Sequence, residues 1–221
     1  MTLTLKGYKY WSHVSPKYEV LADAMLGKNT LSLIREKLSA EGRLGKVAEF
    51  GCGTGFMTKV LAGKADSLIA TDLSDGMVRL AKESVTGFAN VQFQVADCQS
   101  TAFPDREFDT AILSLVLHHV ENPDKTLSEM KRILKPGGTL IIANLTTGLN
   151  LAYFLIFVIR AYYSGFRISH TIMPIPKLLS QPVLRDKLES TGFKVILVER
   201  IKDTSRLANP PVDYIKAIRV P

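Results

Sequence analysis

Short apolar runs alternate with amphipathic segments along most of the chain. Seven runs of continuous or alternating hydrophobic residues predict strands, at 47–50, 67–71, 91–95, 109–113, 139–144, 194–200 and 212–219. Four segments with hydrophobic residues three and four apart predict helices, at 57–61, 76–83, 123–134 and 183–190. Elements in this order predict an α/β fold, a doubly wound and mainly parallel sheet of seven strands with helices on both faces.

The first predicted strand ends in a glycine-rich turn, VAEFGCGTG at residues 47–55. In doubly wound sheets the ligand binds beyond the carboxyl ends of the strands, where the first strand turns into the first helix. Glycines allow a sharp turn there and close approach of a ligand to the main chain. Asp72 ends the next predicted strand, where an acid typically holds a ribose. Phe56 occupies the third glycine position of a dinucleotide fingerprint, which disfavours a dehydrogenase.

Four stretches together resemble the class I S-adenosylmethionine-dependent methyltransferases, in particular the small-molecule group with the ubiquinone and menaquinone enzymes (methyltransferase type 11). The stretches are VAEFGCGTG, ATDLSDGMVRLAK, VADCQSTAFPDREFDTAILSLVLHHV and RILKPGGTLIIAN. The resemblance implies a Rossmann-like fold, S-adenosylmethionine as cofactor, S-adenosylhomocysteine as product and no metal. It also implies in-line transfer of a methyl group to a small-molecule acceptor.

The resemblance also implies roles for individual residues. Glu49 would orient the amino group of the methionine part, and Asp72 would accept hydrogen bonds from both ribose hydroxyls. Asp97 would bind the adenine amino group. The other implied cofactor contacts are Tyr18, Gly51, Cys52, Gly53, Gly55, Leu73, Met77, Cys98, Ser114 and Leu115. Cys52 and Cys98 are interpreted as packing residues and not as nucleophiles.

Two adjacent histidines, His118 and His119, follow the fourth predicted strand. Neighbouring residues point in different directions, so only one is expected to face the acceptor. Position in the resembling family favours His119 as the catalytic base, and a structural or cofactor-lining role is the alternative. His13 is a second candidate, in the aromatic segment YKYWSHVSPKYEVL that resembles the family's N-terminal lid. The adjacent His118 and His119 have no third ligand at a spacing that suits a zinc site.

The segment 149–166, LNLAYFLIFVIRAYYSGF, is almost continuously apolar. It falls where the resembling family inserts a substrate cap, so it either packs inside the cap, lines an apolar acceptor site or contacts a membrane surface. Its longest apolar run stops at Arg160 and is too short to span a bilayer. The net charge is +7, with basic residues in excess in both flanks and acidic residues in excess between them.

One domain is expected, with four parts: an N-terminal helical lid, a cofactor-binding core, a substrate-cap insertion and a C-terminal helix with strands, at 1–43, 44–146, 147–180 and 181–221. The expected function is methyl transfer to a lipophilic acceptor such as a quinone precursor, isoprenoid or lipid headgroup. The alternatives are a polar amine or phenol acceptor, or an interaction protein that binds the cofactor without turnover. The expected location is cytoplasmic, with peripheral membrane contact through 149–166 and no nucleic-acid partner.

Overall fold

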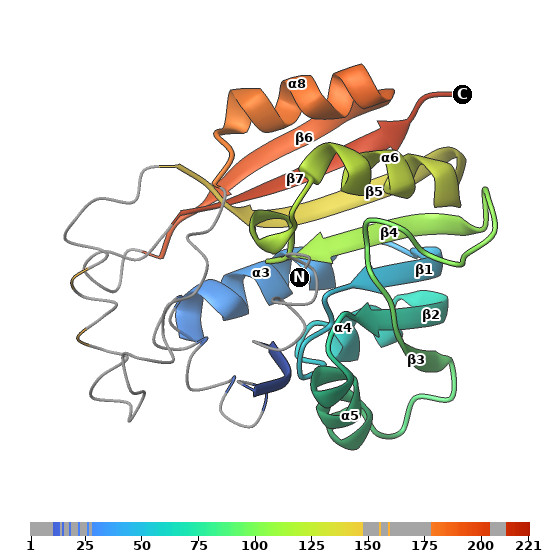
Figure 1. Ribbon diagram of the computed structural model, residues 1–221, viewed down its shortest axis with the longest axis vertical. Coiled ribbons are helices and arrows are strands. Elements are labelled where there is room, and N and C mark those ends of the chain that lie inside the picture. The colour runs from blue at the N-terminus through green and yellow to red at the C-terminus, as the bar shows by residue number, and fades with distance from the viewer. Residues whose placement is uncertain are drawn as a thin grey trace.

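The computed structural model describes residues 28–147, 178–203 and 211–221, together with nine further positions: 11–13, 15, 18, 22, 26, 155 and 159. Seven strands form one sheet in the order β3-β2-β1-β4-β5-β7-β6 (Figure 1). The strands are β1 (Gly45–Phe50), β2 (Ala65–Asp72), β3 (Val91–Val95), β4 (Phe108–Ser114), β5 (Leu134–Leu145), β6 (Phe193–Ile201) and β7 (Val212–Arg219).

Strands β1 to β5 pair in parallel, whereas β7 runs antiparallel to both β5 and β6. The predicted mainly parallel sheet of seven strands is therefore confirmed. The chain crosses from β3 to β4 over β1, so the direction of winding reverses at β1 (Figure 1). In open parallel sheets such a reversal opens a crevice beyond the carboxyl ends of the central strands.

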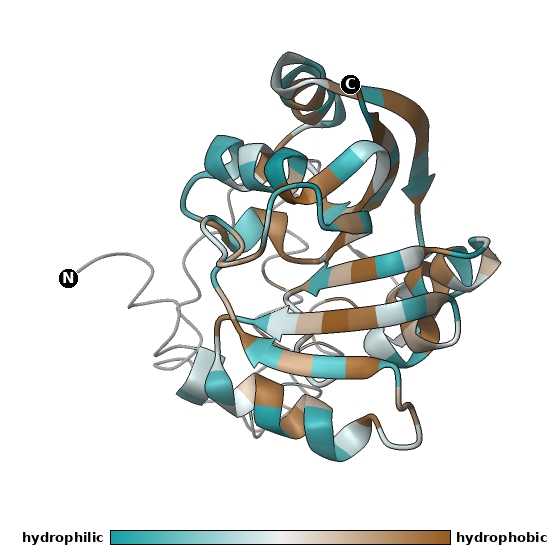
Figure 2. Ribbon diagram, turned by 90° about the vertical axis from the view of Figure 1, so that its right-hand side faces the viewer, coloured by the Kyte–Doolittle hydropathy of each residue, from teal (hydrophilic) through white to brown (hydrophobic). Residues whose placement is uncertain are grey.

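Helices cover both faces of the sheet, as predicted. The α-helices are α3 (Lys28–Ala40), α4 (Thr58–Ala62), α5 (Asp75–Ser84), α6 (Pro123–Ile133) and α8 (Gln181–Thr191), and a short 3₁₀ helix, η2, spans Leu117–His119. Because successive strand residues point to opposite faces, Val47 packs with α3 and α4 while Ala48 packs with α6 and α8. Figure 2 shows hydrophobic residues gathered on the strands between these layers.

Local chemistry sets several helix ends. The Ser74 Oγ accepts the Met77 N–H at 3.2 Å and caps α5, as the sequence predicts. Asn122 Oδ1 caps α6 in the same way, and Pro123 occupies the first helical turn. Gly192 ends α8 in the left-handed conformation, with a φ of 95°.

The strand register brings four strand ends to one edge. Phe50 of β1 pairs with Thr71 of β2 and with Leu113 of β4. Ser114 of β4 pairs in turn with Ala143 of β5. The residues that follow these pairs therefore lie along the crevice at the carboxyl edge of the sheet. Among the described residues, no helix combines the length and apolar character needed to cross a bilayer.

Candidate active site

The glycine turn after β1 needs glycine for both conformation and space. Gly51 and Gly55 have φ angles of 68° and 87°, in the region that other residues rarely adopt. A Cβ at Gly51 would lie 2.1 Å from the Val116 side chain, and one at Gly55 would lie 2.5 Å from the Val85 side chain. Any side chain at either position would therefore displace its neighbours and move the main chain of the turn.

The Asp72 carboxylate ties this turn to the start of α5. Its Oδ2 accepts the Gly53 N–H at 3.0 Å and its Oδ1 accepts the Ser74 N–H at 2.9 Å. Burial raises the pKa of Asp72, and the backbone N–H groups oppose that shift. Each carboxylate oxygen can accept a further hydrogen bond, so the group can bind two neighbouring hydroxyls, such as those of a ribose.

Glu49 is a buried carboxylate one residue before the end of β1. It is 1% exposed, and its Oε2 accepts the Thr58 Oγ hydrogen at 2.7 Å. Burial raises its pKa to about 7 despite that hydrogen bond. No lysine or arginine of the described part of the chain forms an ion pair with it. A buried carboxylate of this kind suits a ligand that brings its own positive charge.

The end of β4 contributes an unusual polar atom and an unusual backbone conformation. The Ser114 Oγ is buried and has no hydrogen-bond partner among the described residues. Leu115 has a φ of 60°, and its N–H donates to the Ala143 carbonyl at 2.7 Å. Buried orphan atoms and left-handed non-glycine residues are uncommon, and both cluster at ligand sites. Serine at this position can therefore donate to or accept from a bound ligand.

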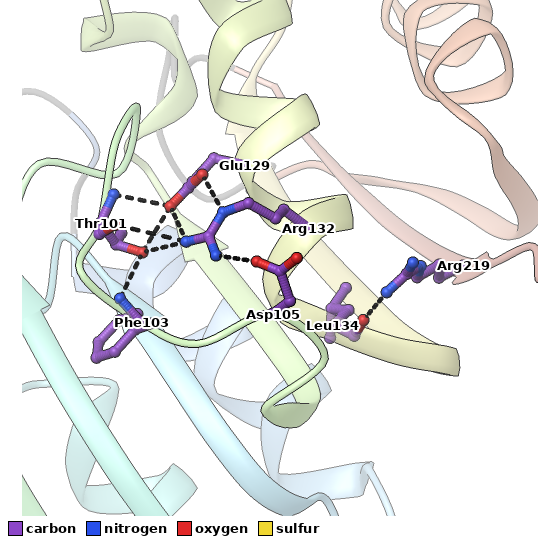
Figure 3. A network of polar contacts seen from close by, with 7 residues as sticks. All are labelled: Thr101, Phe103, Asp105, Glu129, Arg132, Leu134 and Arg219. Carbon is purple, nitrogen blue, oxygen red and sulfur yellow. Dashed lines mark hydrogen bonds and ion pairs between the residues drawn. The ribbon is translucent and has the colours of Figure 1, made fainter.

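The loop after β3 carries Asp97 and Cys98 and is fastened to α6 (Figure 3). Asp97 Oδ1 accepts the Gln99 N–H at 2.9 Å. Further along the loop, the Thr101 N–H and Oγ both donate to Glu129 Oε1, at 2.7 and 2.6 Å. Arg132 of α6 binds the same Glu129 oxygen at 2.8 Å. Burial raises the pKa of Glu129, but these hydrogen bonds outweigh it and lower the pKa to about 2.

Residues near the N-terminus lie over the glycine turn and the start of α5. The Tyr18 ring lies 3.4 Å from the position that a Cβ on Gly53 would take. The Ser12 Oγ lies 3.0 Å from the Ser74 Oγ. Burial, with a smaller effect of the Asp72 charge, raises the pKa of Tyr18 to about 12, so its hydroxyl stays protonated. Tyr18, predicted as a cofactor contact, is thus next to the glycine turn.

A pocket adjoins this turn, because Tyr18 lines the pocket and also lies next to Gly53. Its described lining is mostly apolar, with two histidines: Trp11, Tyr18, Ala22, Leu26, Leu115, His118, His119 and Leu145. The His119 ring lies edge-on to Trp11, with centroids 4.8 Å apart, and 4.0 Å from the His118 ring. Burial lowers the pKa of His118 to about 4 and that of His119 well below 6.5. Both rings are therefore neutral near pH 7.

Asn144 is a polar site residue that the sequence reasoning missed. It is buried near the end of β5, and its Oδ1 lies 2.7 Å from His118 Nδ1. The sequence signal that could have identified it is a single polar side chain at the end of the apolar run TLIIAN. In the structure this position follows Ala143, which pairs with Ser114 at the end of β4. His13, by contrast, is exposed and is not among the residues that line the pocket.

The remaining predicted contacts are distributed around α5 and the two loops. Met77 is buried on α5, Leu73 is half-buried before it, and Cys52 is buried inside the glycine turn. Burial raises the pKa of the Cys52 thiol, and raises that of Cys98 to about 12, so both remain protonated. No group of three metal-binding side chains occurs in the described ranges.

Comparisons with known proteins agree with this architecture. The family described as "Methyltransferase domain" matches residues 48–142. The ubiquinone/menaquinone biosynthesis C-methyltransferase UbiE of Hydrogenovibrio crunogenus is 31% identical over 137 residues, 58% of this chain and 54% of that protein. UbiE of Geobacter sulfurreducens is 30% identical over 161 residues, 66% of this chain and 61% of that protein. The chain thus spans about half the length of the curated relatives it matches.

A solved structure supports the fold independently. The putative methyltransferase bound to the Haloferax volcanii Trm112 activator superposes with a TM-score of 0.73 over 96% of this chain and 98% of that chain, at 16% identity. At this identity the likeness shows a shared fold. The sequence stretches, the sheet order and the family match over residues 48–142 together support a class I S-adenosylmethionine-dependent methyltransferase.

Proposed function

We propose that this chain transfers a methyl group from S-adenosylmethionine to a small lipophilic acceptor bound in the pocket beside the glycine turn. The observation that carries this proposal is the described lining of the pocket, which is apolar apart from two neutral histidines, the Tyr18 hydroxyl and the Trp11 indole N–H. A charged acceptor would lose its hydration there, and no described lining residue carries a charge to replace it. An apolar acceptor would instead gain from burial.

The described residues fit the cofactor group by group. Asp72 has free lone pairs for the ribose hydroxyls, and Glu49 is a buried carboxylate without a described cationic partner, suited to the methionine amino group. The orphan Ser114 Oγ supplies a polar contact for the methionine part, and Asp97 one for the adenine amino group. When bound, S-adenosylmethionine supplies an electrophilic methyl group that needs no further activation.

The protein's own contribution is then orientation and exclusion of water. Trp11 and Tyr18 cover the pocket from the N-terminal side, while Leu115 and Leu145 form its wall at the ends of β4 and β5. Holding two reactants in line can supply about 7–11 kcal/mol of a reaction barrier. A dry apolar wall also prevents water from competing as nucleophile.

Among lipophilic acceptors, a quinone precursor has the best support. The relatives in Hydrogenovibrio crunogenus and Geobacter sulfurreducens are named ubiquinone/menaquinone biosynthesis C-methyltransferases. The matched region holds the cofactor motifs, however, and much of the cap segment 149–166 lies outside the described residues. An isoprenoid or a lipid headgroup therefore remains within the proposed class of acceptor.

Methyl-labelled S-adenosylmethionine tests the proposal. The purified protein is incubated with the label and a whole-cell extract of the source organism, and the products are partitioned between organic solvent and water. Label in the organic phase supports the lipophilic acceptor, and the Asp72→Ala variant should transfer none. Label confined to water-soluble products would replace the proposal with a polar amine or phenol acceptor. Unimpaired cofactor binding without any transfer would favour a non-catalytic binding protein.

We also propose that segment 149–166 rests on an anionic membrane surface. Leu155 and Ile159 are helical, one turn apart, and 52% and 53% exposed. Large apolar side chains exposed on one helix face suit the boundary between headgroups and acyl chains. Arg160 within this segment and Arg167 directly after it complement anionic headgroups. A lipophilic acceptor could then enter the pocket from the bilayer.

A further inference from the structure

The two adjacent histidines of the pocket differ in what they can offer a ligand. We propose that His118 Nε2 is a permanent hydrogen-bond acceptor that selects, among apolar molecules, those presenting a hydroxyl or N–H group. The molecule selected is the methyl acceptor of the proposed function, so this inference rests on that function. In this proposal His118 makes the polar contact with the ligand, whereas position in the resembling family favours His119 as the residue that faces the methyl acceptor.

The Asn144 amide has only one orientation that satisfies its neighbours. Its Nδ2 donates to the Leu145 carbonyl at 3.0 Å, and its Oδ1 accepts the backbone N–H of His118 at 3.2 Å. A carbonyl can only accept and a backbone N–H can only donate, so both bonds identify the same amide atom as oxygen. The atom facing the His118 ring is therefore an acceptor.

That acceptor determines the tautomer of His118. Asn144 Oδ1 lies 2.7 Å from His118 Nδ1, so Nδ1 must carry the proton of this bond. In a neutral imidazole the other nitrogen, Nε2, then holds a lone pair. The pKa of about 4 that follows from burial keeps the ring neutral at physiological pH. Nε2 therefore accepts hydrogen bonds near neutral pH and is a poor base.

The surroundings of Nε2 make this lone pair selective. His118 is buried and lines the pocket, and no hydrogen bond from a described residue reaches Nε2. A ligand with a donor would satisfy the lone pair, while an apolar ligand would leave it desolvated and unpaired. An unpaired buried group of this kind costs about 1–3 kcal/mol, which corresponds to roughly 5- to 150-fold in affinity.

His119 does not have the same constraint. It is only partly buried, and no side chain in the described ranges forms a hydrogen bond that would select one of its tautomers. Its ring packs edge-on against Trp11 instead. The geometry therefore makes His119 part of the aromatic wall and His118 the polar contact.

A pair of probes with the same apolar body tests the inference, namely 4-propylphenol and its methyl ether, 4-propylanisole. Trp11 is the only tryptophan of the chain and lines the pocket, so its fluorescence reports occupancy. The full-length protein is loaded with S-adenosylhomocysteine and titrated with each probe, exciting tryptophan where neither probe absorbs. We expect the phenol to bind about 10- to 100-fold more tightly than the ether.

Equal affinities for the two probes would overturn the inference while leaving the apolar pocket intact. Failure of both probes to change the Trp11 signal would overturn the pocket as an acceptor site, and the inference with it. The matched variants are His118→Phe and His119→Phe, which each replace one ring with another. We expect only His118→Phe to abolish the preference for the phenol. Loss of that preference in His119→Phe alone would contradict the inference.

A second measurement uses the wild-type protein alone, so it does not depend on whether a variant folds. Proton–nitrogen correlation spectra of the wild-type imidazole rings distinguish the two neutral tautomers. We expect one buried histidine in the Nδ1–H form across pH 5.5–8, whose Nε2 resonance shifts when 4-propylphenol is added and not when 4-propylanisole is added. The Nε2–H form for that histidine, or no difference between the probes, would refute the assignment.

Discussion

At the scale of single residues, the site is built from carboxylates whose settings differ. Asp72 is held by two backbone N–H groups, so its orientation is set before any ligand binds. Glu49 has a single described hydrogen bond, from Thr58, and burial makes its charged form unfavourable. The first carboxylate is therefore preorganised, whereas the second depends on the charge that a ligand brings.

Replacing Asp72 with alanine should abolish cofactor binding. The change removes the proposed ribose acceptor and leaves the Gly53 and Ser74 N–H groups without their partner. Hydrogen bonds to a charged group contribute about 1.5–3 kcal/mol each, so affinity should fall at least about 100-fold. Calorimetric titration with S-adenosylmethionine measures this. Asp66→Ala, at the exposed start of the same strand, is the control, and a near-normal affinity of Asp72→Ala would disprove the ribose assignment.

Glu49 should make cofactor binding depend on pH. Its pKa of about 7 in the free protein means that a proton must leave before it can pair with a cationic group. Affinity for S-adenosylmethionine should therefore rise by up to about tenfold per unit between pH 5.5 and 7, and level off above. Calorimetry in buffers of different ionisation enthalpy would detect the released proton. A pH-dependent affinity in Glu49→Gln equal to that of the wild type would refute this explanation.

The same pKa fixes the sign of a stability effect. The folded chain without cofactor binds the Glu49 proton more tightly than the unfolded chain, whose glutamate has a pKa near 4.5. The free energy of unfolding should therefore decrease as pH rises from about 4.5 to about 7, as far as Glu49 determines it. Bound S-adenosylmethionine should oppose this loss, because it stabilises the ionised form.

At the scale of elements, two loops of the site are fastened to helices. The glycine turn is bound to the start of α5 through Asp72, and the loop after β3 is bound to α6 through Glu129 and Arg132 (Figure 3). Arg132 also bonds Asp105 at the far end of that loop. These bonds fasten the loop that carries Asp97 to α6.

Truncating Glu129 to alanine should loosen the Asp97 loop. The change leaves the Thr101 N–H and the Arg132 guanidinium without their shared partner. We expect the free energy of unfolding to fall by about 1–3 kcal/mol. We also expect a weaker affinity for S-adenosylmethionine at temperatures where the variant is still fully folded. Thermal unfolding and calorimetry measure the two effects. The control is Glu189→Ala, which breaks an exposed ion pair with Arg185 and should change neither stability nor affinity measurably. A normal affinity in Glu129→Ala would show that cofactor binding does not depend on this anchor.

At the scale of the whole molecule, the two proposed contacts lie in different parts of the chain. The pocket combines residues from the N-terminal region with the ends of β4 and β5, while Leu155 and Ile159 belong to the segment between β5 and β6. This is the segment in which the family resemblance implies a substrate cap. Membrane contact through it would bring the enzyme to the phase in which a lipophilic acceptor is dissolved.

The double substitution Leu155→Ser and Ile159→Ser should weaken binding to membranes. Both side chains are about half exposed, so the change removes apolar surface with little cost to folding. Less of the double variant than of the wild type should co-sediment with vesicles that contain phosphatidylglycerol. The wild type should bind neutral vesicles less than these anionic vesicles, and its binding to the anionic vesicles should be lost at high salt. Ile196→Ser is the control, because Ile196 is 49% exposed on the edge strand β6. Unchanged sedimentation of the folded double variant would leave the segment as a cap.

The local chemistry of the sequence determined most of the fold. Alternating and continuous apolar runs located all seven strands, and Ser74 and Gly192 marked helix ends, because these signals depend on neighbours a few residues apart. The glycine turn and Asp72 were recognisable for the same reason. Their roles toward the cofactor remain predictions, as does the division of the chain into four parts.

The contacts that only the tertiary structure decided join residues far apart in the chain. His118 meets Asn144 across 26 positions, Thr101 meets Glu129 across 28, and Ser12 meets Ser74 across 62. No periodic pattern encodes such pairs, since they depend on strand order and register at the carboxyl edge of the sheet. The sequence therefore determined the order of the elements and the motifs that resemble a cofactor site, whereas the packing of β4 beside β5 decided that His118, and not His119, meets Asn144.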